Sequence, residues 1–412
     1  MSTPTMEAIY NDPQALLRMT ETPEGKRDPH PLFNRLREIA PIYHDPLSGL
    51  HFLFRWDDCN KVLRSNRFGQ GNRLEQDPRY AGSDALQFIN RNLAFKDAPD
   101  HTRLRNFAQK AFTRPVVERM RGYLEKLTQS VLDELESKTE IDVVADYSAR
   151  IPGTVICEML GIPRADHERF DAWVADQFRL LSPMPTPDDV LREVDASTRE
   201  LIKYLGELIE ARRAAPQDDL ISNFLAVKDE SGQTMSNAEL IPMCSVLLGG
   251  GSDTTKFVIA MAIRALVAHP EQARKMRGDP GLQGKAFEEF LRFYGPVTMG
   301  NLRVSFDDID LGGYPIKAGE AVVPVLLAAN FDPGAFPEPN QLDVARHPNL
   351  HLAFGGGAHA CLGMMLARLV GPYAIDAFNR RVPNVEVLDE RLDINEQLFA
   401  LRGLRSMRVR RV

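Results

Sequence analysis

Apolar residues recur at helical spacing between residues 100 and 270, and short alternating apolar runs lie on either side of that region. Within it, the capping box Ser236-Asn237-Ala238-Glu239 opens an apolar stretch that runs to Ala268. At about 1.5 Å per residue, the stretch Asn237–Ala268 predicts a helix about 48 Å long. Further helices are predicted over Pro31–Ala40, Asp57–Ser65, Leu282–Tyr294 and Leu362–Phe378.

Short strands are predicted on both sides of the helical region. The runs Ile42–His44 and His51–Trp56 flank a turn that contains proline and glycine, and they predict a hairpin. Later strands are predicted at Val297–Val304, Asp310–Ile316 and Ala321–Val325, and the tail Met407–Val412 predicts an exposed edge strand.

These elements predict a mostly α (α+β) protein with small β-sheets. The long polar stretch Arg67–Lys96 is weakly periodic, and we expect it to be a functional loop. The composition does not change abruptly along the chain, so we expect an irregular segment over residues 1–30 and one domain over residues 31–412.

Composition narrows the function classes. The chain has 412 residues and a formal net charge of −7, which argues against a general nucleic-acid binder. The longest apolar run, Ala321–Ala329, is far shorter than the roughly 20 residues of a membrane span. No basic and apolar leader is visible at the N-terminus, so we expect a cytoplasmic protein. We also expect a monomer. The four cysteines lie far apart and predict free thiols.

One cysteine lies in a segment with its own chemistry, Phe354-Gly355-Gly356-Gly357-Ala358-His359-Ala360-Cys361-Leu362-Gly363. Consecutive glycines let the backbone approach a flat ligand closely. Cys361 precedes a predicted helix, whose N-terminus would stabilise a thiolate. Such a thiolate binds a soft metal or acts as a nucleophile. Without a second cysteine nearby, zinc and iron–sulfur sites are disfavoured, and a single axial ligand to haem iron remains.

The segment matches the haem-binding signature F-x-x-G-x-[HR]-x-C-x-G in full, so the chain resembles the cytochrome P450 superfamily of haem-thiolate monooxygenases, and in particular its soluble bacterial members. The resemblance implies a single cytochrome P450 fold with a long central helix over the haem. It also implies haem b (iron protoporphyrin IX) as cofactor, with Cys361 as the iron ligand.

A second motif lies in the middle of the long predicted helix, at Gly250-Gly251-Ser252-Asp253-Thr254-Thr255. Glycines in a helix cost about 1 kcal/mol each, and close approach of a ligand would explain them. The Thr254 hydroxyl can bond back to a carbonyl one turn earlier. The resemblance implies that Asp253 and Thr254 form the acid–alcohol pair that handles protons during dioxygen scission.

Two further groups gain weight from the resemblance. Glu289 and Arg292 share a helix face, and the family joins such a pair to a later arginine in a structural network behind the haem, here Arg346. The family often has arginine at the position of Phe331, which raises the question of local packing there. The cations that match positions for haem propionate contact are His101, Arg105, Arg303 and His359.

The resemblance also implies a substrate pocket and partners. Its lining would come from the Arg67–Lys96 loop and from Leu247, Leu248, Gly249, Val297, Thr298, Met299, Leu398, Phe399 and Ala400. This apolar set suits a hydrophobic small molecule, hydroxylated or epoxidised with one atom of O2. Electrons would come from a ferredoxin with its NAD(P)H-dependent reductase, docked on a basic patch of Arg103, Lys110 and Arg114.

Two other functions stay open at this point. A family member that uses peroxide directly or runs non-oxygenating chemistry would often lack the Asp253–Thr254 pair. A non-catalytic haem-binding scaffold would typically lack the cysteine that stands here as Cys361.

Overall fold

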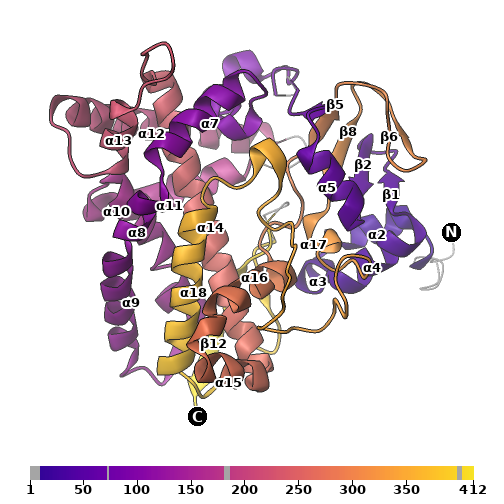
Figure 1. Cartoon of the computed structure of the whole chain (residues 1–412), viewed down its shortest axis with the longest axis vertical. Coiled ribbons are helices and arrows are strands. Elements are labelled where there is room, and N and C mark those ends of the chain that lie inside the picture. The colour runs from indigo at the N-terminus through magenta and orange to yellow at the C-terminus, as the bar shows by residue number, and fades with distance from the viewer. Residues whose placement is uncertain (1–9, 72–73, 181–185, 397–400) are drawn as a thin grey trace. The chain divides into compact units, whose positions relative to one another are not determined.

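The computed structural model of the chain describes residues 10–71, 74–180, 186–396 and 401–412. Helix α14, Asn237–Ala268, has the bounds that the apolar pattern predicts and spans 32 residues (Figure 1). One of the two capping-box hydrogen bonds is present, because the Ser236 backbone N–H donates to Glu239 Oε2 at 2.9 Å, whereas the Glu239 N–H bonds to the Ser236 carbonyl instead of its hydroxyl. Among the described residues α14 alone is long and apolar enough to cross a membrane, by length and composition, and 56% of its most apolar window is buried inside the protein.

The chain divides into two compact units, each assembled from separate stretches of sequence. Unit 1 contains residues 1–69, 264–361 and 389–407. Unit 2 contains residues 70–263, 362–388 and 408–412, and therefore holds most of α14. The expectation of one domain over residues 31–412 remains a prediction.

Unit 2 is largely helical (Figure 1). Its α-helices besides α14 are α6 (Asp84–Arg91), α7 (Asp100–Ala111), α8 (Arg114–Arg119), α9 (Arg121–Leu135), α10 (Pro152–Leu160), α11 (His167–Phe178), α12 (Asp188–Ala214), α13 (Leu220–Ala226) and α18 (Met364–Arg381). Helix α12 packs against α6 and α11 through a stripe of buried residues that includes Leu191, Val194, Leu201 and Leu205. Helix α18 packs against α9, and the Tyr147 hydroxyl donates to its Ala374 carbonyl at 2.6 Å.

Unit 1 contains most of the β-structure. Its main sheet has the strand order β1-β2-β8-β5-β3, in which β2 and β8 are parallel and the other pairs antiparallel. Those strands are β1 (Ile42–His44), β2 (Leu50–Leu53), β3 (Phe68–Gly69), β5 (Arg303–Ser305) and β8 (Ala321–Pro324). Two small pairs are β6 (Ile309–Asp310) with β7 (Pro315–Ile316), and β10 (Asp393–Ile394) with β11 (Leu404–Ser406). The predicted hairpin at residues 42–56 is confirmed, although its second strand ends at Leu53.

Unit 1 also contains helices, several of which pack on its sheet. They are α2 (Pro13–Met19), α3 (Pro23–Arg27), α4 (His30–Ile39), α5 (Trp56–Arg64), α15 (Pro270–Gly278), α16 (Gln283–Tyr294) and α17 (Leu326–Ala329). One cluster joins buried residues of α2, α4 and β8, among them Leu16, Phe33 and Val323. A second cluster joins Cys59 and Val62 of α5 with buried residues of β2, β3, β7 and β8. The predicted helices 31–40, 57–65 and 282–294 are confirmed to within one residue at each end.

Several expectations about segments are wrong. The predicted strand Val297–Val304 is reduced to β5, and Asp310–Ile316 is the antiparallel pair of β6 and β7 instead of one strand. Residues 1–30 are not irregular throughout, because Asp12 and Thr22 cap α2 and α3. The Arg67–Lys96 stretch contains α6, which Ser83 caps and which buries one apolar face. The tail is not a sheet edge, because β12 (Arg408–Arg411) pairs on both sides, with β4 (Glu140–Asp142) and with β9 (Val385–Val387).

Candidate haem-thiolate site

The segment around Cys361 is a tight loop in unit 1. Gly355 and Gly357 have φ values of +67° and +65°, which side chains rarely adopt. The loop closes through a hydrogen bond from the Cys361 backbone N–H to the Phe354 carbonyl at 2.9 Å. The predicted start of the following helix is wrong: α18 begins at Met364, so Cys361 precedes its first residue by three positions. The helix N-terminus therefore contributes less to a thiolate than the sequence suggests.

The loop glycines have different reasons to be glycine. A Cβ at Gly357 would clash with the Leu63 carbonyl oxygen of α5. A Cβ at Gly355 would meet no described heavy atom closer than the His359 carbonyl oxygen at 3.9 Å. The loop thus lies directly on α5 through Gly357 and leaves room on the side of Gly355.

Cys361 differs from the other cysteines in its exposure. Cys59, Cys157 and Cys244 are buried, whereas Cys361 is partly exposed. Burial raises the pKa of the Cys244 thiol to about 12 and also raises the pKa of the Cys59 thiol, so both remain protonated at neutral pH. Cys361 is therefore the cysteine best placed to meet a ligand.

The glycines of α14 also divide by environment. A Cβ at Gly249 would lie 3.5–3.8 Å from the side chains of Val174 and Phe178 on α11. A Cβ at Gly251 would lie 3.4 Å from the nearest side-chain atom of Ile156 on α10. At both positions a Cβ would face the neighbouring helix at ordinary van der Waals distance, so the expectation that close approach of a ligand explains the glycines of α14 does not hold for these two. A Cβ at Gly250 would meet no described heavy atom within 4 Å, so the helix offers open space at this position.

Beside this open space, α14 carries the predicted acid–alcohol pair. The Thr254 hydroxyl donates to the Gly250 carbonyl at 2.5 Å, as expected from its spacing. Lys256 Nζ lies 2.5 Å from Asp253 Oδ1. Sequence reasoning missed this ion pair, although the i, i+3 spacing on a predicted helix is visible in the sequence.

The predicted propionate cations occur in both units. His101 and Arg105 lie one turn apart on α7 in unit 2, and His101 is 4% exposed. Arg303, on β5 in unit 1, is also 4% exposed. His359, in unit 1, belongs to the short 3-10 turn before Cys361. Arginine and histidine side chains can donate charge-assisted hydrogen bonds to a carboxylate, so these four residues are of the type that haem propionates would need.

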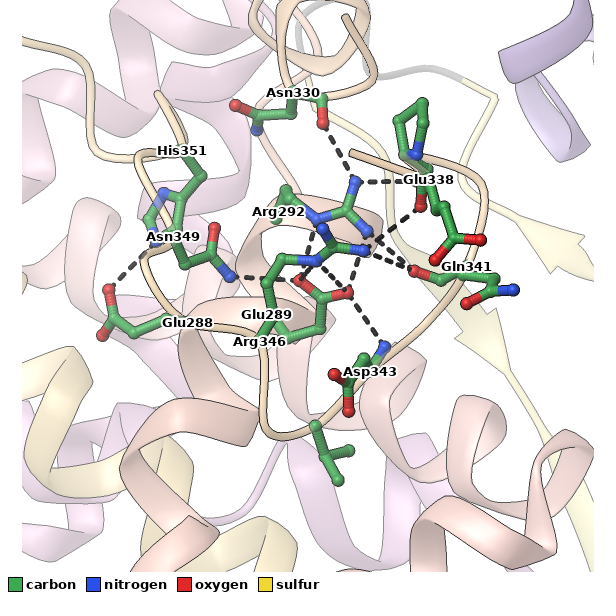
Figure 2. Close-up of polar contacts among 12 residues, drawn as sticks. Glu288, Glu289, Arg292, Asn330, Glu338, Gln341, Asp343, Arg346, Asn349 and His351 are labelled. Carbon is green, nitrogen blue, oxygen red and sulfur yellow. Dashed lines mark hydrogen bonds and ion pairs between the residues drawn. The ribbon is translucent and has the colours of Figure 1, made fainter. Parts of the chain in front are cut away.

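Glu289 is the centre of a hydrogen-bond network that brings together Arg292 and Arg346, the two arginines that the sequence grouped with it (Figure 2). Arg292 donates to both of its carboxylate oxygens at 2.8 Å, and Arg346 Nε donates at 3.1 Å. The carboxylate also accepts the Asp343 backbone N–H at 3.1 Å and the Asn349 side-chain amide at 3.0 Å. Glu289 and Arg292 are fully buried, so α16 is tied to the segment that leads to Cys361.

Phe331 packs well despite its departure from the family pattern. It is 2% exposed, and its ring lies 4.9 Å from that of Phe293 and 5.1 Å from the Arg292 guanidinium. The apolar Phe331 ring therefore packs against the buried Arg292 guanidinium, at a position where the family often has another arginine.

The predicted substrate-pocket residues are only partly brought together. Val297 forms a β-bridge with Leu401, the residue that directly follows the predicted segment 398–400. Leu398 and Phe399, with Ala400, lie outside the described residues. The remaining predicted lining residues are mostly buried in protein: Leu247, Leu248 and Met299 at 5%, 2% and 3% exposure.

Thr298 lines a different space. It faces a unit 1 cavity of about 20 Å³ together with Phe33 and Arg402, a volume that suits water rather than a substrate.

The predicted basic docking patch loses one member. Arg103 forms ion pairs with Asp229 and Glu239, so its charge is neutralised within unit 2. Lys110 and Arg114 are exposed, and Lys110 Nζ donates to the Lys228 carbonyl at 3.1 Å.

Several of these features fit a haem group. Cys361 is partly exposed, and Gly250 offers space that a Cβ would fill. Gln70 in unit 2 is 1% exposed, and neither polar atom of its side chain finds a hydrogen-bond partner among the described residues. Within the described part of the chain, no three His, Cys, Asp or Glu side chains gather as a metal site.

Comparison with known proteins gives the same family. The cytochrome P450 family matches residues 68–279 and 283–371. The polyketide biosynthesis cytochrome P450 PksS of Bacillus subtilis (strain 168) is 33% identical over 403 residues, which cover 94% of this chain and 97% of PksS. The vitamin D(3) 25-hydroxylase of Pseudonocardia autotrophica is 34% identical over 390 residues, which cover 93% of this chain and 94% of that enzyme.

Solved structures are similar as well. The crystal structure of P450BioI in complex with an acyl carrier protein ligated to hexadec-9Z-enoic acid has a TM-score of 0.87 and 31% identity. The similarity covers 94% of this chain and 99% of that one. Fold, family match and relatives therefore agree that this chain belongs to the cytochrome P450 family of haem-dependent monooxygenases.

Proposed function

We propose that Cys361 is the thiolate ligand of the haem iron and that the enzyme oxygenates a hydrophobic small molecule. The observation that supports this most directly is the Cys361 loop, in which Cys361 is partly exposed while the other cysteines are buried. The reduced, carbon monoxide-treated enzyme should show the Soret band of a thiolate-ligated haem. Cys361→Ala should abolish that band, and a variant that retains it would contradict the assignment.

Bound haem supplies reductive activation of dioxygen, in which two electrons and two protons are consumed, one oxygen atom enters the substrate and the other leaves as water. The protein supplies proton delivery and binding. The Asp253 carboxylate on α14 would relay protons from solvent, and the Thr254 hydroxyl would hold a proton beside the open space at Gly250. His101, Arg105, Arg303 and His359 would hold the propionates by charge-assisted hydrogen bonds.

The substrate class follows from the apolar surroundings of α14 and from the relatives. The names of the relatives refer to polyketide biosynthesis and to vitamin D(3), and one neighbour holds a fatty acyl group on a carrier protein. These molecules share a large hydrophobic body, so we assign this enzyme a hydrophobic substrate that it hydroxylates or epoxidises. Titration with hydrophobic metabolites should shift the Soret band, whereas polar metabolites of similar size should not.

We further propose a ferredoxin with an NAD(P)H-dependent reductase as the electron donor. The exposed cations Lys110 and Arg114 in unit 2 would attract an acidic partner. Charge reversal at both should slow reduction by ferredoxin and leave substrate binding unchanged. Arg103→Ala is not a test of docking, because Arg103 is already paired with Asp229 and Glu239. An unchanged reduction rate in the double variant would remove this patch from the proposal.

The competing function within the family is direct use of peroxide. The Asp253–Thr254 pair favours dioxygen, because that route takes up two protons from solvent, whereas hydrogen peroxide already carries the two protons that its reaction uses. Product should therefore form with ferredoxin, reductase, NAD(P)H and O2 and form poorly with hydrogen peroxide alone. Equal rates under both conditions would favour the peroxide route. We expect the enzyme to act in the cytoplasm as a monomer.

A further inference from the structure

The segment that leads to Cys361 has a second buried anchor besides the Glu289 network. The His351 side chain is 3% exposed, and its Nε2 lies 3.0 Å from Glu288 Oε2 on α16. Its Nδ1 accepts the Ala353 backbone N–H at 3.2 Å. Because Nδ1 is the acceptor, Nε2 carries the ring proton and donates it to the carboxylate.

The hydrogen bonds continue from this anchor to the cysteine. The Leu352 backbone N–H donates to Asn330 Oδ1 at 2.7 Å, directly beside the Ala353 bond. The next residue, Phe354, has its ring 5.9 Å from that of His351 and its carbonyl bonded to the Cys361 N–H at 2.9 Å. His351 is thus connected to Cys361 through Ala353, Phe354 and the hydrogen bond between the Phe354 carbonyl and the Cys361 N–H.

Two consecutive glutamates of α16 hold the segment at two points (Figure 2). Glu289 binds the Asn349 amide at 3.0 Å, and Glu288 binds His351 at 3.0 Å. The Glu289 contact belongs to a network that also includes two arginines. The Glu288–His351 contact is separate and lies closer to the cysteine along the chain.

We propose that His351, held by Glu288, is a positioning residue for the Cys361 thiolate. The inference rests on the proposed ligation of iron by Cys361. The loop has two glycines in the left-handed region, so its backbone has little stiffness of its own. An anchor immediately before it restricts where the sulfur can lie, as the outer contacts of metal ligands commonly do.

The test uses the haem-loaded enzyme and its carbon monoxide spectrum. His351→Ala should raise the rate at which the thiolate Soret band is lost roughly tenfold at equal haem content. His351→Asn should restore most of the stability of the band, because an Asn side-chain oxygen can accept the N–H two residues further on. Glu288→Ala should give an intermediate rate, since the ring keeps its bond to Ala353.

A matched control is His269→Ala. His269 forms an exposed pair with Glu271 in the same unit, with 3.6 Å between Nδ1 and Oε1, and its loss should leave the band unchanged. Hydrogen exchange of the Ala353 amide in the haem-free protein gives a second readout, and it should be faster in His351→Ala than in His351→Asn.

The outcomes are distinguishable. Wild-type stability of the band and wild-type exchange of the amide in His351→Ala would overturn the positioning role while leaving Cys361 as the ligand. Absence of a thiolate band from the wild-type enzyme would overturn the ligation by Cys361, and with it this role of His351.

Discussion

Lys256 Nζ lies 2.5 Å from Asp253 Oδ1, one helical turn further along α14. The two side chains are only 22% and 17% exposed, so solvent screens this ion pair less than a surface pair. Lys256 Nζ also lies 4.8 Å from the centroid of the Phe257 ring, which limits its movement. The carboxylate proposed to relay protons is therefore held by its own helix.

Lys256→Met should lower the yield of product per reductant consumed. Without the ammonium group, the Asp253 carboxylate loses the partner that fixes its orientation. We expect roughly a tenfold loss, smaller than the roughly hundredfold loss that removal of a proton donor itself can cause. Measurement of NAD(P)H, product and released hydrogen peroxide checks this. Lys256→Arg should keep the yield high, and equal yields in wild type and Lys256→Met would contradict the role.

Gly250→Ala should stabilise the haem-free protein more than Gly251→Ala does. A Cβ at Gly250 meets open space, so alanine should stabilise α14 of the haem-free protein by about 0.5–1 kcal/mol. A Cβ at Gly251 lies 3.4 Å from Ile156, so alanine there should gain less or destabilise. Urea unfolding of the haem-free protein measures both. In the haem-loaded enzyme Gly250→Ala should weaken the binding of a hydrophobic substrate. An unchanged affinity for that substrate would show that the open space at Gly250 is not used.

Gly357→Ala and Gly355→Ala separate steric clash from backbone strain. Both positions have φ near +65°, so alanine should cost about 1 kcal/mol at either. Only at Gly357 would the new Cβ also clash with the Leu63 carbonyl oxygen of α5. Gly357→Ala should therefore lose haem during purification, whereas Gly355→Ala should retain most of it. Similar haem contents in the two variants would argue against close packing of the loop on α5.

Arg292→Leu should destabilise the protein by about 3–5 kcal/mol, because it leaves the fully buried Glu289 carboxylate without its main partner. Arg346→Leu should cost less, since Arg292, Asn349 and the Asp343 N–H still satisfy Glu289. Chemical denaturation of both variants, monitored by circular dichroism, measures the difference. A larger loss in Arg346→Leu would mean that Arg346 acts through contacts outside this carboxylate.

His30 is a buried imidazole at the start of α4. Its ring lies 3.9 Å from that of Phe331, and neither ring nitrogen has a hydrogen-bond partner among the described residues. Burial, with smaller contributions from nearby arginines, lowers the pKa of His30 well below 6.5.

The lowered pKa makes the folded protein sensitive to acid. Below about pH 6.5 the unfolded chain binds a proton at His30 while the folded protein does not. The free energy of unfolding therefore decreases as the pH is lowered. His30→Phe should reduce that fall between about pH 7 and about pH 5. Unfolding free energies of both proteins at several pH values test this, with His269→Ala as an exposed control. Parallel pH curves for wild type and His30→Phe would contradict the assignment.

The sequence alone determined the elements that depend on neighbours along the chain. The bounds of α14, the hairpin of β1 and β2, and the Thr254 bond to Gly250 all follow from spacing within a few residues. Periodicity also placed Glu289 and Arg292 on one face of α16. The cysteine motif needed no tertiary contact, because its pattern of fixed residues is contiguous.

Tertiary structure decided the features that depend on what lies opposite a residue. The pattern of residues 67–96 did not reveal α6, whose helix is stabilised by burying one face in unit 2. The charged tail became a central strand because β4 and β9 flank it. Nothing in the sequence distinguishes Gly250 from Gly249 and Gly251, or pairs Glu288 with His351 across 63 positions. Local sequence sets backbone preference, whereas partners distant along the chain set burial and pairing, and those partners are chosen only when the chain folds.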